Sequence, residues 1–308
     1  MTAQHSATGG GTPPLQTEGR NPRTLEMDRL SVEELARCLH RENYTVTEAV
    51  EAALPQIAQA IDVIAKRLSA GGRLFYVGAG TSGRLGVLDA SECPPTFGVE
   101  PEMVQGIIAG GDTALRSSIE GAEDVREKGA EDLRARGVQA EDVVAGIAAS
   151  GRTPYVIGAL DAARQAGAFA IAVVNVRPAT MEAVADLTIA TITGPEALTG
   201  STRLKAGTAQ KMILNLLSTG AMVRLGKTYG NLMVDVRATN EKLRDRAVRI
   251  VTAATDADAG QAQAALEQTD WHAKTAIVLL RLGVTPEEAA ARLRRAGGFV
   301  RDALGESG

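Results

Sequence analysis

Five short apolar segments alternate with helix-like segments between residues 73 and 192, and this alternation restricts the chain to few folds. The apolar segments are residues 73–77, 103–108, 142–147, 168–174 and 187–192. Each has the length of a β-strand and is apolar enough to be buried on both faces. The intervening segments, such as 113–134 and 154–166, have helical patterns. This order predicts an α/β fold, in which a mainly parallel five-stranded sheet lies between helices.

The segments on either side of this region are predicted to be helical. Ser31 and Glu34 form a capping-box pattern, and apolar residues then recur every three or four positions over residues 50–68. Pro55 falls within that stretch, where it is expected to kink or break the helix. After the predicted sheet, residues 204–225 carry one apolar stripe and form another long helix.

We divide the chain into three parts. Residues 1–20 are rich in Gly, Thr, Pro, Ser and Gln without periodicity, which predicts a flexible tail. Residues 21–245 hold the sheet and its helices, and residues 246–308 form a small helical C-terminal subdomain. Within that subdomain, Thr285 is followed by a proline, which is typical of a helix start. No pattern there indicates chemistry, so we expect the subdomain to support packing or dimerisation.

Charge, cysteine and histidine content argue against several classes of function. The chain has 33 basic and 37 acidic residues, a net charge of −4, which gives no sign of the basic surface that nucleic-acid binding requires. The two cysteines cannot form a disulfide framework, and no apolar secretion signal or membrane span is present, so a cytoplasmic protein is expected. The three histidines are scattered, and no metal motif is present. We therefore expect no metal or organic cofactor, and catalysis by carboxylates, cationic side chains, hydroxyls and backbone amides.

The loop after the first predicted strand is typical of an anion-binding site. Residues 78–83 match GxGxxG, which also occurs in dinucleotide-binding folds, but the nearest carboxylate suited to a ribose, Asp112, comes late. The loop supplies backbone N–H groups and two hydroxyls at a helix N-terminus, where the helix dipole favours an anion such as phosphate. A glycine-rich turn that merely packs a strand against a helix is the alternative. The residues concerned are Gly80, Thr81, Ser82 and Gly83.

The loop after the third predicted strand repeats this design. It places Ser150, Gly151, Arg152 and Thr153 before Pro154, with the threonine expected as N-cap and the proline at the first helical position. Two hydroxyl-bearing loops at one sheet edge can hold one phosphate from both sides. The pair therefore favours a phosphorylated small molecule over a dinucleotide.

A third polar cluster and several carboxylates complete the candidates. Ser201, Arg203 and Lys205 precede the long helix and can neutralise a carboxylate, a phosphate or a developing oxyanion, or can simply be solvated helix-start residues. Glu92 follows the first loop by one helix, next to a Pro-Pro pair. Glu120 and Glu123 are three residues apart and would share a helix face if that segment were helical. Periodicity and composition do not choose among these glutamates.

Several long strings of the sequence are typical of one protein family. They cover residues 17–22, 78–98, 120–124, 146–160, 194–211 and 230–243. On these strings the chain resembles the bacterial N-acetylmuramic acid 6-phosphate etherases, and the likeness extends over residues 17–304. The resemblance implies the sugar isomerase (SIS) fold with a small helical C-terminal region. It also implies a carbon–oxygen lyase that cleaves the D-lactyl ether of N-acetylmuramate 6-phosphate, giving N-acetylglucosamine 6-phosphate and D-lactate in cell-wall recycling.

The same resemblance marks Glu92 and Glu123 as the acid–base pair. In the ring-opened sugar the C2 proton lies next to the C1 aldehyde, which makes it acidic enough for a carboxylate to remove. We hypothesise that Glu123 removes this proton, and that Glu92 protonates the departing lactate oxygen and then activates water. The two hydroxyl-bearing loops would hold the 6-phosphate, while Arg203 or Lys205 would meet the lactate carboxylate or the C1 oxygen.

Two other functions fit part of the pattern. The glucokinase regulatory protein, a relative of this family, binds sugar phosphates without transforming them, so a non-catalytic regulator is the main alternative. A sugar-phosphate isomerase is another, because it uses the same proton abstraction. SIS proteins generally form dimers, so a homodimer is expected by analogy, with a sugar phosphate as ligand and neither nucleic acid nor membrane as partner.

Overall fold

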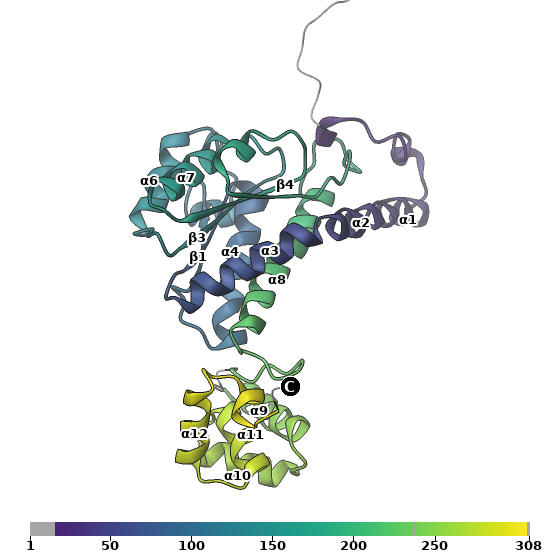
Figure 1. Cartoon of the computed structure of the whole chain (residues 1–308). Coiled ribbons are helices and arrows are strands. Elements are labelled where there is room, and N and C mark those ends of the chain that lie inside the picture. Colours follow the sequence, from purple (N-terminus) through teal and green to yellow (C-terminus); the bar gives the residue numbers. More distant parts are fainter. Residues whose placement is uncertain (1–15, 237, 239, 307–308) are drawn as a thin grey trace, which may run out of the picture.

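The computed structural model describes residues 16–236, 238 and 240–306. A sheet region with a projecting helical arm forms one part of the molecule, and the C-terminal helices lie together at the opposite end (Figure 1). Most of the predicted flexible tail, residues 1–20, lies outside the described residues. Its described part differs from a free tail, because Thr17 is fully buried within the short 3-10 helix η1 (Gln16–Glu18).

The predicted parallel sheet is confirmed. Its strands pair in the order β2-β1-β3-β4-β5, and every pairing is parallel. Because β2 and β3 pair with opposite sides of β1, the loops after β1 and β3 flank the point where the chain changes direction across the sheet, the usual ligand site in such folds. The strands are β1 (Leu74–Gly78), β2 (Val104–Ile108), β3 (Val143–Ala148), β4 (Phe169–Val174) and β5 (Leu187–Ala190).

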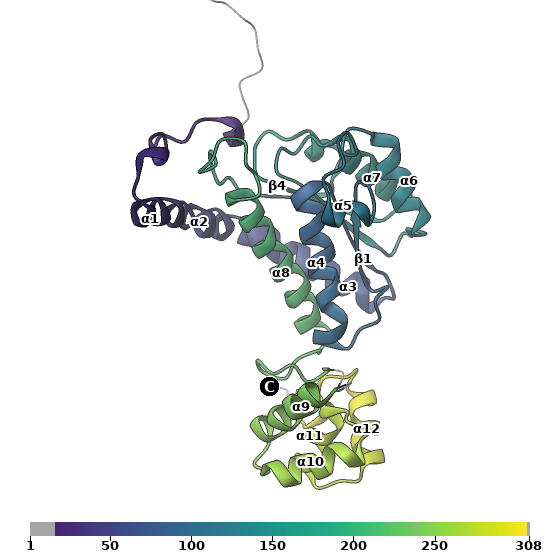
Figure 2. The ribbon, with the colours of Figure 1, turned by 180° about the vertical axis from the view of Figure 1, so that it is seen from behind.

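Side chains alternate between the two faces of the sheet and build two hydrophobic cores. Leu74 and Tyr76 point to one core, while Phe75 and Val77 point to the other, and all four are fully buried. The first core is closed by α3 (Leu54–Ser69), α4 (Gly80–Phe97) and α8 (Lys205–Arg224). The second is closed by α6 (Arg126–Ala135) and α7 (Pro154–Gln165). The sheet therefore lies between two helical layers (Figure 2).

The N-terminal arm consists of η2 (Met27–Arg29), α1 (Val32–Glu42) and α2 (Tyr44–Ala52). The predicted capping box forms, because the Ser31 hydroxyl accepts the N–H of Glu34 at 3.4 Å and the Glu34 carboxylate accepts the N–H of Ser31 at 3.0 Å. The predicted break near Pro55 is also confirmed. Helix α2 ends at Ala52, and α3 begins two residues later with Pro55 in its first turn, where a missing N–H is tolerated.

One predicted helix is interrupted. The segment 113–134 contains α5 (Thr113–Arg116) and all of α6 except its last residue, but residues 117–125 between them form turns and irregular structure. Gly121 has a φ of +70°, a left-handed conformation that a regular helix does not use. The predicted continuous helix over this segment is therefore wrong, and Glu120 and Glu123 do not share a helix face.

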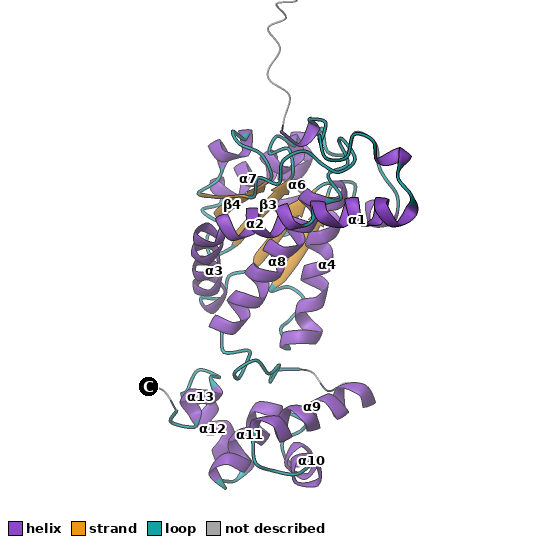
Figure 3. Cartoon of the chain, turned by 90° about the vertical axis from the view of Figure 1, so that its right-hand side faces the viewer, coloured by secondary structure: helices purple, strands orange, loops and turns teal. Residues whose placement is uncertain are grey.

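The C-terminal helices lie together, apart from the sheet (Figure 3). They have a hydrophobic core of their own. This core also includes Val234, and α9 begins at Glu241, so the helical subdomain starts before the predicted boundary at residue 245. Thr285 caps its helix as expected, accepting the N–H of Glu288 at 3.3 Å. None of the helices in the described part of the chain combines the length and apolarity that crossing a membrane requires. The remaining elements are η3 (Thr180–Val184), α9 (Glu241–Ala254), α10 (Ala259–Gln268), α11 (Ala273–Leu282), α12 (Pro286–Arg295) and α13 (Val300–Ala303).

Candidate active site

A cavity of about 540 Å³ lies beyond the carboxyl ends of β1 and β3. Its walls come from the loops after these two strands, from the turn before α6, from η1 and from the segment before α8. We call it the phosphate cavity. The structure brings together in it seven of the residues that the sequence singled out: Gly80, Thr81, Ser82, Glu123, Ser150, Arg152 and Thr153.

The first loop presents an uncapped helix N-terminus to this cavity. Helix α4 begins at Gly80 with Ala79 as N-cap, whose methyl side chain cannot satisfy the first N–H groups. These N–H groups and the positive end of the helix dipole are free to bind an anion. The Ser82 side chain donates to Gln210 Oε1 at 2.8 Å, and Gln210 donates to Asn175 Oδ1 at 3.0 Å. This buried chain fixes the orientation of the Ser82 hydroxyl.

The second loop offers a similar arrangement at the start of α7. Thr153 stands at the N-cap position before Pro154, as the sequence predicted, but its side chain makes no capping hydrogen bond. Its hydroxyl is therefore available to a ligand. The N–H of Tyr155, in the first turn of α7, donates to the backbone oxygen of Glu123 at 3.0 Å. This bond ties the turn that carries Glu123 to the second loop.

Glu123 lies between the phosphate cavity and a second cavity of about 320 Å³. The two cavities share Ala79, Gly80 and Glu123, so they form neighbouring parts of one groove. Arg84 lines the second cavity, as do Ser118 and Glu120. The Arg84 Nε donates to the Leu115 carbonyl at 3.1 Å, and no hydrogen bond links the two terminal guanidinium nitrogens of Arg84 to the described residues. The sequence analysis missed Arg84, which follows the GxGxxG pattern by one position.

Charge in the phosphate cavity is predominantly acidic. Glu18, Glu123 and Asp124 line it, and among the described residues Arg152 is its one cationic side chain. An anion bound here would therefore depend on the two helix N-termini and on hydroxyl groups at least as much as on Arg152. Sequence reasoning missed Glu18, Asp124 and Thr202 as lining residues, although Glu18 lies in one of the family-like strings, residues 17–22.

Gly83 and Gly151 support the two loops without lining the cavity. A Cβ atom at Gly83 would lie 2.6 Å from Ile108 Cγ1, and one at Gly151 would lie 2.5 Å from the Ala179 Cβ. Gly151 also has a φ of +62°. Both glycines therefore permit close backbone packing beneath the loops.

The third polar cluster is not part of either cavity. The Lys205 side chain is 1% exposed, and its Nζ donates to Glu42 and to the Pro195 carbonyl, both at 3.0 Å. The geometry therefore gives Lys205 a structural role and does not support the predicted contact with substrate. Ser201 and Arg203 line neither cavity, whereas Thr202 between them lines the phosphate cavity.

Glu92 was predicted to follow the helix after the first loop, but it lies within α4, which continues to Phe97, and is on the exposed surface twelve residues after Gly80. At 1.5 Å per helical residue this corresponds to about 18 Å along the helix axis. Glu92 lines neither cavity. Within one chain, the structure does not bring Glu92 to the groove in which Glu123 lies.

The family model of the glucokinase regulatory protein N-terminal SIS domain matches residues 56–164. The N-acetylmuramic acid 6-phosphate etherase of Mycolicibacterium smegmatis is 57% identical, over 94% of this chain and 98% of that protein. The etherase of Serratia proteamaculans is 56% identical over 94% and 98%, and etherase 2 of Vibrio cholerae is 54% identical over 95% and 95%. Among solved structures, a phosphoheptose isomerase from Francisella tularensis matches 63% of this chain and 99% of its own, with 18% identity and a TM-score of 0.49.

Proposed function

The chain belongs to the N-acetylmuramic acid 6-phosphate etherase family and is a lyase-type enzyme. We propose that it binds N-acetylmuramate 6-phosphate in the groove formed by the phosphate cavity and the second cavity, and cleaves it there. The reaction converts N-acetylmuramate 6-phosphate and water into N-acetylglucosamine 6-phosphate and D-lactate, as a step in cell-wall recycling. The observation that best supports placing the reaction in this groove is the position of Glu123 beside two uncapped helix N-termini, those of α4 and α7. We further propose that the enzyme works in the cytoplasm, in keeping with its two unpaired cysteines.

The 6-phosphate binds between the N-termini of α4 and α7. The N–H groups after Ala79 donate to its oxygens, and the hydroxyl of Thr153, which caps no helix, donates from the opposite side. Arg152 has no ion-pair partner among the described residues and supplies the positive side chain. Three acidic residues line the same cavity and repel the phosphate. The phosphate is therefore confined to the end of the cavity at which α4 and α7 begin.

Glu123 is the base that removes the C2 proton. The ring-opened sugar has an aldehyde at C1, so the electrons of the broken C2–H bond delocalise onto the carbonyl oxygen. They then form the C2–C3 double bond as the C3–O bond to lactate breaks. The leaving oxygen takes a proton from an acid, for which we propose Glu92. Water then adds to C3 and a proton returns to C2, which gives N-acetylglucosamine 6-phosphate.

The lactyl group lies in the second cavity, beside Arg84. A substrate whose phosphate lies in the phosphate cavity would extend past Glu123 into the second cavity, because Glu123 lines both cavities. The Arg84 guanidinium has two nitrogens without protein partners among the described residues, a geometry suited to a carboxylate. Arg84 thereby takes the role that the sequence analysis gave to Arg203 or Lys205.

Glu92 reaches the groove from a second copy of the chain. In its own chain it is about 18 Å along α4 from the phosphate loop, and Leu88, one turn earlier on the same helix face, is 52% exposed. The projecting arm also leaves Val32 86% exposed and Tyr44 60% exposed. A homodimer would cover such apolar side chains and supply the missing acid.

Product assays and isotope exchange test these roles separately. Wild-type protein should release D-lactate from N-acetylmuramate 6-phosphate. Glu123→Gln should abolish exchange of the C2 proton with solvent deuterium, whereas Glu92→Gln should retain exchange and form little product, because proton removal precedes departure of lactate. Glu127→Gln, an exposed glutamate one turn further along, is the matched control and should behave as wild type.

Equal exchange in the Glu123 and Glu92 variants would contradict the assignment of base and acid. Binding of the phosphosugar by wild-type protein without any lactate release would instead favour a non-catalytic regulator.

A further inference from the structure

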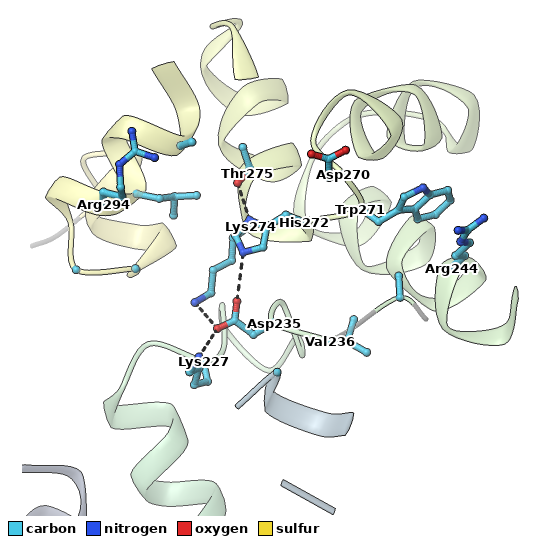
Figure 4. Close-up of a pocket in the computed structure, with 16 residues that line it drawn as sticks. Lys227, Asp235, Val236, Arg244, Asp270, Trp271, His272, Lys274, Thr275 and Arg294 are labelled. Atoms are coloured by element: carbon cyan, nitrogen blue, oxygen red, sulfur yellow. Dashed lines mark hydrogen bonds and ion pairs between the residues drawn. The ribbon is translucent and has the colours of Figure 1, made fainter. Parts of the chain in front are cut away.

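A further cavity, of about 970 Å³, lies where the C-terminal helices meet the sheet region (Figure 4). We call it the junction cavity. On the sheet side it is lined by Gly98, directly after α4, and by Lys227, three residues after the end of α8. On the other side it is lined by residues of α9, α11 and α12, of the segments before α9 and α11, and of the segment after α12. The proposed reaction uses none of these residues.

The junction cavity gathers positive charge on a chain that is acidic overall. Four cationic side chains line it, Lys227, Arg244, Lys274 and Arg294, against the two carboxylates Asp235 and Asp270. With His272 neutral, the lining therefore carries a net charge of +2 (4 − 2), whereas the whole chain carries −4. A cavity with this sign of charge attracts small anions.

One carboxylate is shared by two ammonium groups at the centre of this cavity. Asp235 Oδ2 lies 2.6 Å from Lys274 Nζ and 3.1 Å from Lys227 Nζ, and His272 Nε2 lies 3.9 Å from its other oxygen (Figure 4). The Lys274 side chain is 6% exposed, and burial lowers its pKa despite the contact with Asp235. An additional anion would compensate the positive charge that Asp235 leaves unbalanced.

The rim supplies further donors. Arg294 has no hydrogen-bond or ion-pair partner among the described residues. Arg244 stacks on the Trp271 ring, with its guanidinium carbon 4.9 Å from the ring centroid. Asp270 and Trp271 adopt φ values of +48° and +59°, a costly left-handed conformation for side-chain-bearing residues, which places the indole beside the cavity. The adjoining Gly297 and Gly298 fill little space.

We propose that the junction cavity is a second binding site, which takes a small phosphorylated molecule and is separate from the phosphate cavity. Its ligand would touch Lys227 from the sheet region and Arg294 and Lys274 from the C-terminal helices, and so would hold the two parts together. Helices α4 and α8 begin near the phosphate cavity and end at the junction cavity, so the two sites lie at opposite ends of the same helices.

The protein contains a direct reporter of this site. Trp271 is the only tryptophan in the chain and it lines the junction cavity. Titration of the full-length protein with N-acetylglucosamine 6-phosphate, and separately with inorganic phosphate, should change its fluorescence saturably. Unphosphorylated N-acetylglucosamine should not. A response to the sugar phosphate at concentrations at least tenfold below those needed for inorganic phosphate would identify the sugar as part of the ligand.

Variants distinguish this site from the phosphate cavity. Arg294→Ala should weaken the fluorescence response at least tenfold, whereas Arg295→Ala removes the same charge from the next residue, which does not line the cavity, and should leave it unchanged. A Ser82→Ala/Ser150→Ala double variant should keep the response. The proposal is overturned if neither phosphate compound gives a saturable change, or if both arginine variants weaken it equally. Neither outcome depends on lactate release, so failure here leaves the proposed reaction unaffected.

Discussion

Glu42 joins the N-terminal segment to the start of α8 through a buried set of charge-assisted hydrogen bonds. Its side chain is 3% exposed and accepts from Arg23 at 2.6 and 2.8 Å, from Asn21 at 2.6 Å and from Lys205 at 3.0 Å. The same segment carries Glu18, which lines the phosphate cavity. Glu42 therefore helps to hold one wall of the candidate active site in place.

The hydrogen bonds from Arg23, with those from Lys205 and Asn21, outweigh the effect of burial and lower the pKa of Glu42 from 4.5 to about 2. A lowered folded-state pKa stabilises the fold above the unfolded pKa, and this contribution is lost as the pH falls from about 4.5 toward 2. Glu42→Gln should therefore be less stable than wild type near pH 6. The difference in unfolding free energy should shrink by about 2 kcal/mol when the pH is lowered to about 3.

Urea unfolding at the two pH values measures this difference. Glu48→Gln, an exposed acidic residue on α2, is the control and should differ little from wild type at either pH. A Glu42→Gln destabilisation of the same size at both pH values would show that Glu42 is not held ionised by its neighbours.

Arg84 is the residue to which we assign recognition of the lactyl carboxylate. Arg84→Gln should raise the KM for N-acetylmuramate 6-phosphate about tenfold or more, because a hydrogen bond to a charged group contributes about 1.5–3 kcal/mol. Binding of N-acetylglucosamine 6-phosphate, which lacks the lactyl group, should change little. Arg116→Gln, an exposed arginine on α5, controls for the loss of charge. Equal losses for both ligands would place the lactyl group elsewhere.

The sequence predicts a residue's role where local backbone conformation determines that role, as at the start of a helix. Thr153 and Pro154 mark the start of α7, and that position followed from the residue types alone. Lys205 illustrates the limit, because a lysine before a helix can face solvent, substrate or a distant carboxylate. Its partner Glu42 is 163 positions away, and no local pattern indicates that contact.

At the scale of elements, α6 and α7 position Glu123 through unusually close packing. A Cβ atom at Gly158 of α7 would lie 1.9 Å from the Arg126 carbonyl oxygen, and one at Gly129 of α6 would lie 1.8 Å from the Tyr155 carbonyl oxygen. Arg126 follows Glu123 by three residues. The two helices approach this closely because each contributes a glycine at the contact.

Gly158→Ala should therefore force α6 away from α7. We expect a loss of about 1–3 kcal/mol in unfolding free energy, typical of an overpacked contact. We also expect a lower kcat, since the turn with Glu123 moves with the start of α6. Gly260→Ala is the matched control, because its Cβ would meet no atom closer than the Asp258 side chain, at 3.3 Å. If Gly158→Ala is as stable as wild type, α6 and α7 can move apart at this contact at little cost in free energy, and the prediction is wrong.

The sequence predicted the strands better than the segment with the catalytic candidate. Strands buried on both faces have an apolar pattern of their own, so β1 to β5 fell close to the expected positions. The turn at residues 117–125 falls within segment 113–134, for which the sequence predicts a helix. Gly121 with a left-handed φ, and the bond from Tyr155 to Glu123, decide the conformation there. The second of these is a tertiary contact.

At the scale of the whole molecule, the groove of one chain contains a proposed base without its proposed acid. Glu92 and Glu123 fall in strings that resemble the same family, yet Glu92 lies on the outer surface of α4. A sequence pattern indicates that a residue matters, but it does not indicate which copy of the chain uses it. Subunit geometry therefore could not be predicted from the residues that suggested the pair.

Mixed dimers test whether two chains share each site. If Glu123 of one chain acts with Glu92 of the other, a dimer of one Glu92→Gln chain and one Glu123→Gln chain has one intact site and one doubly substituted site. Such dimers, co-expressed with two different tags and purified through both, should have about half of the wild-type activity. Each variant dimer alone should form little or no product. If both glutamates act within one chain, each site of the mixed dimer contains one substitution and no activity returns, and the shared-site proposal is then wrong.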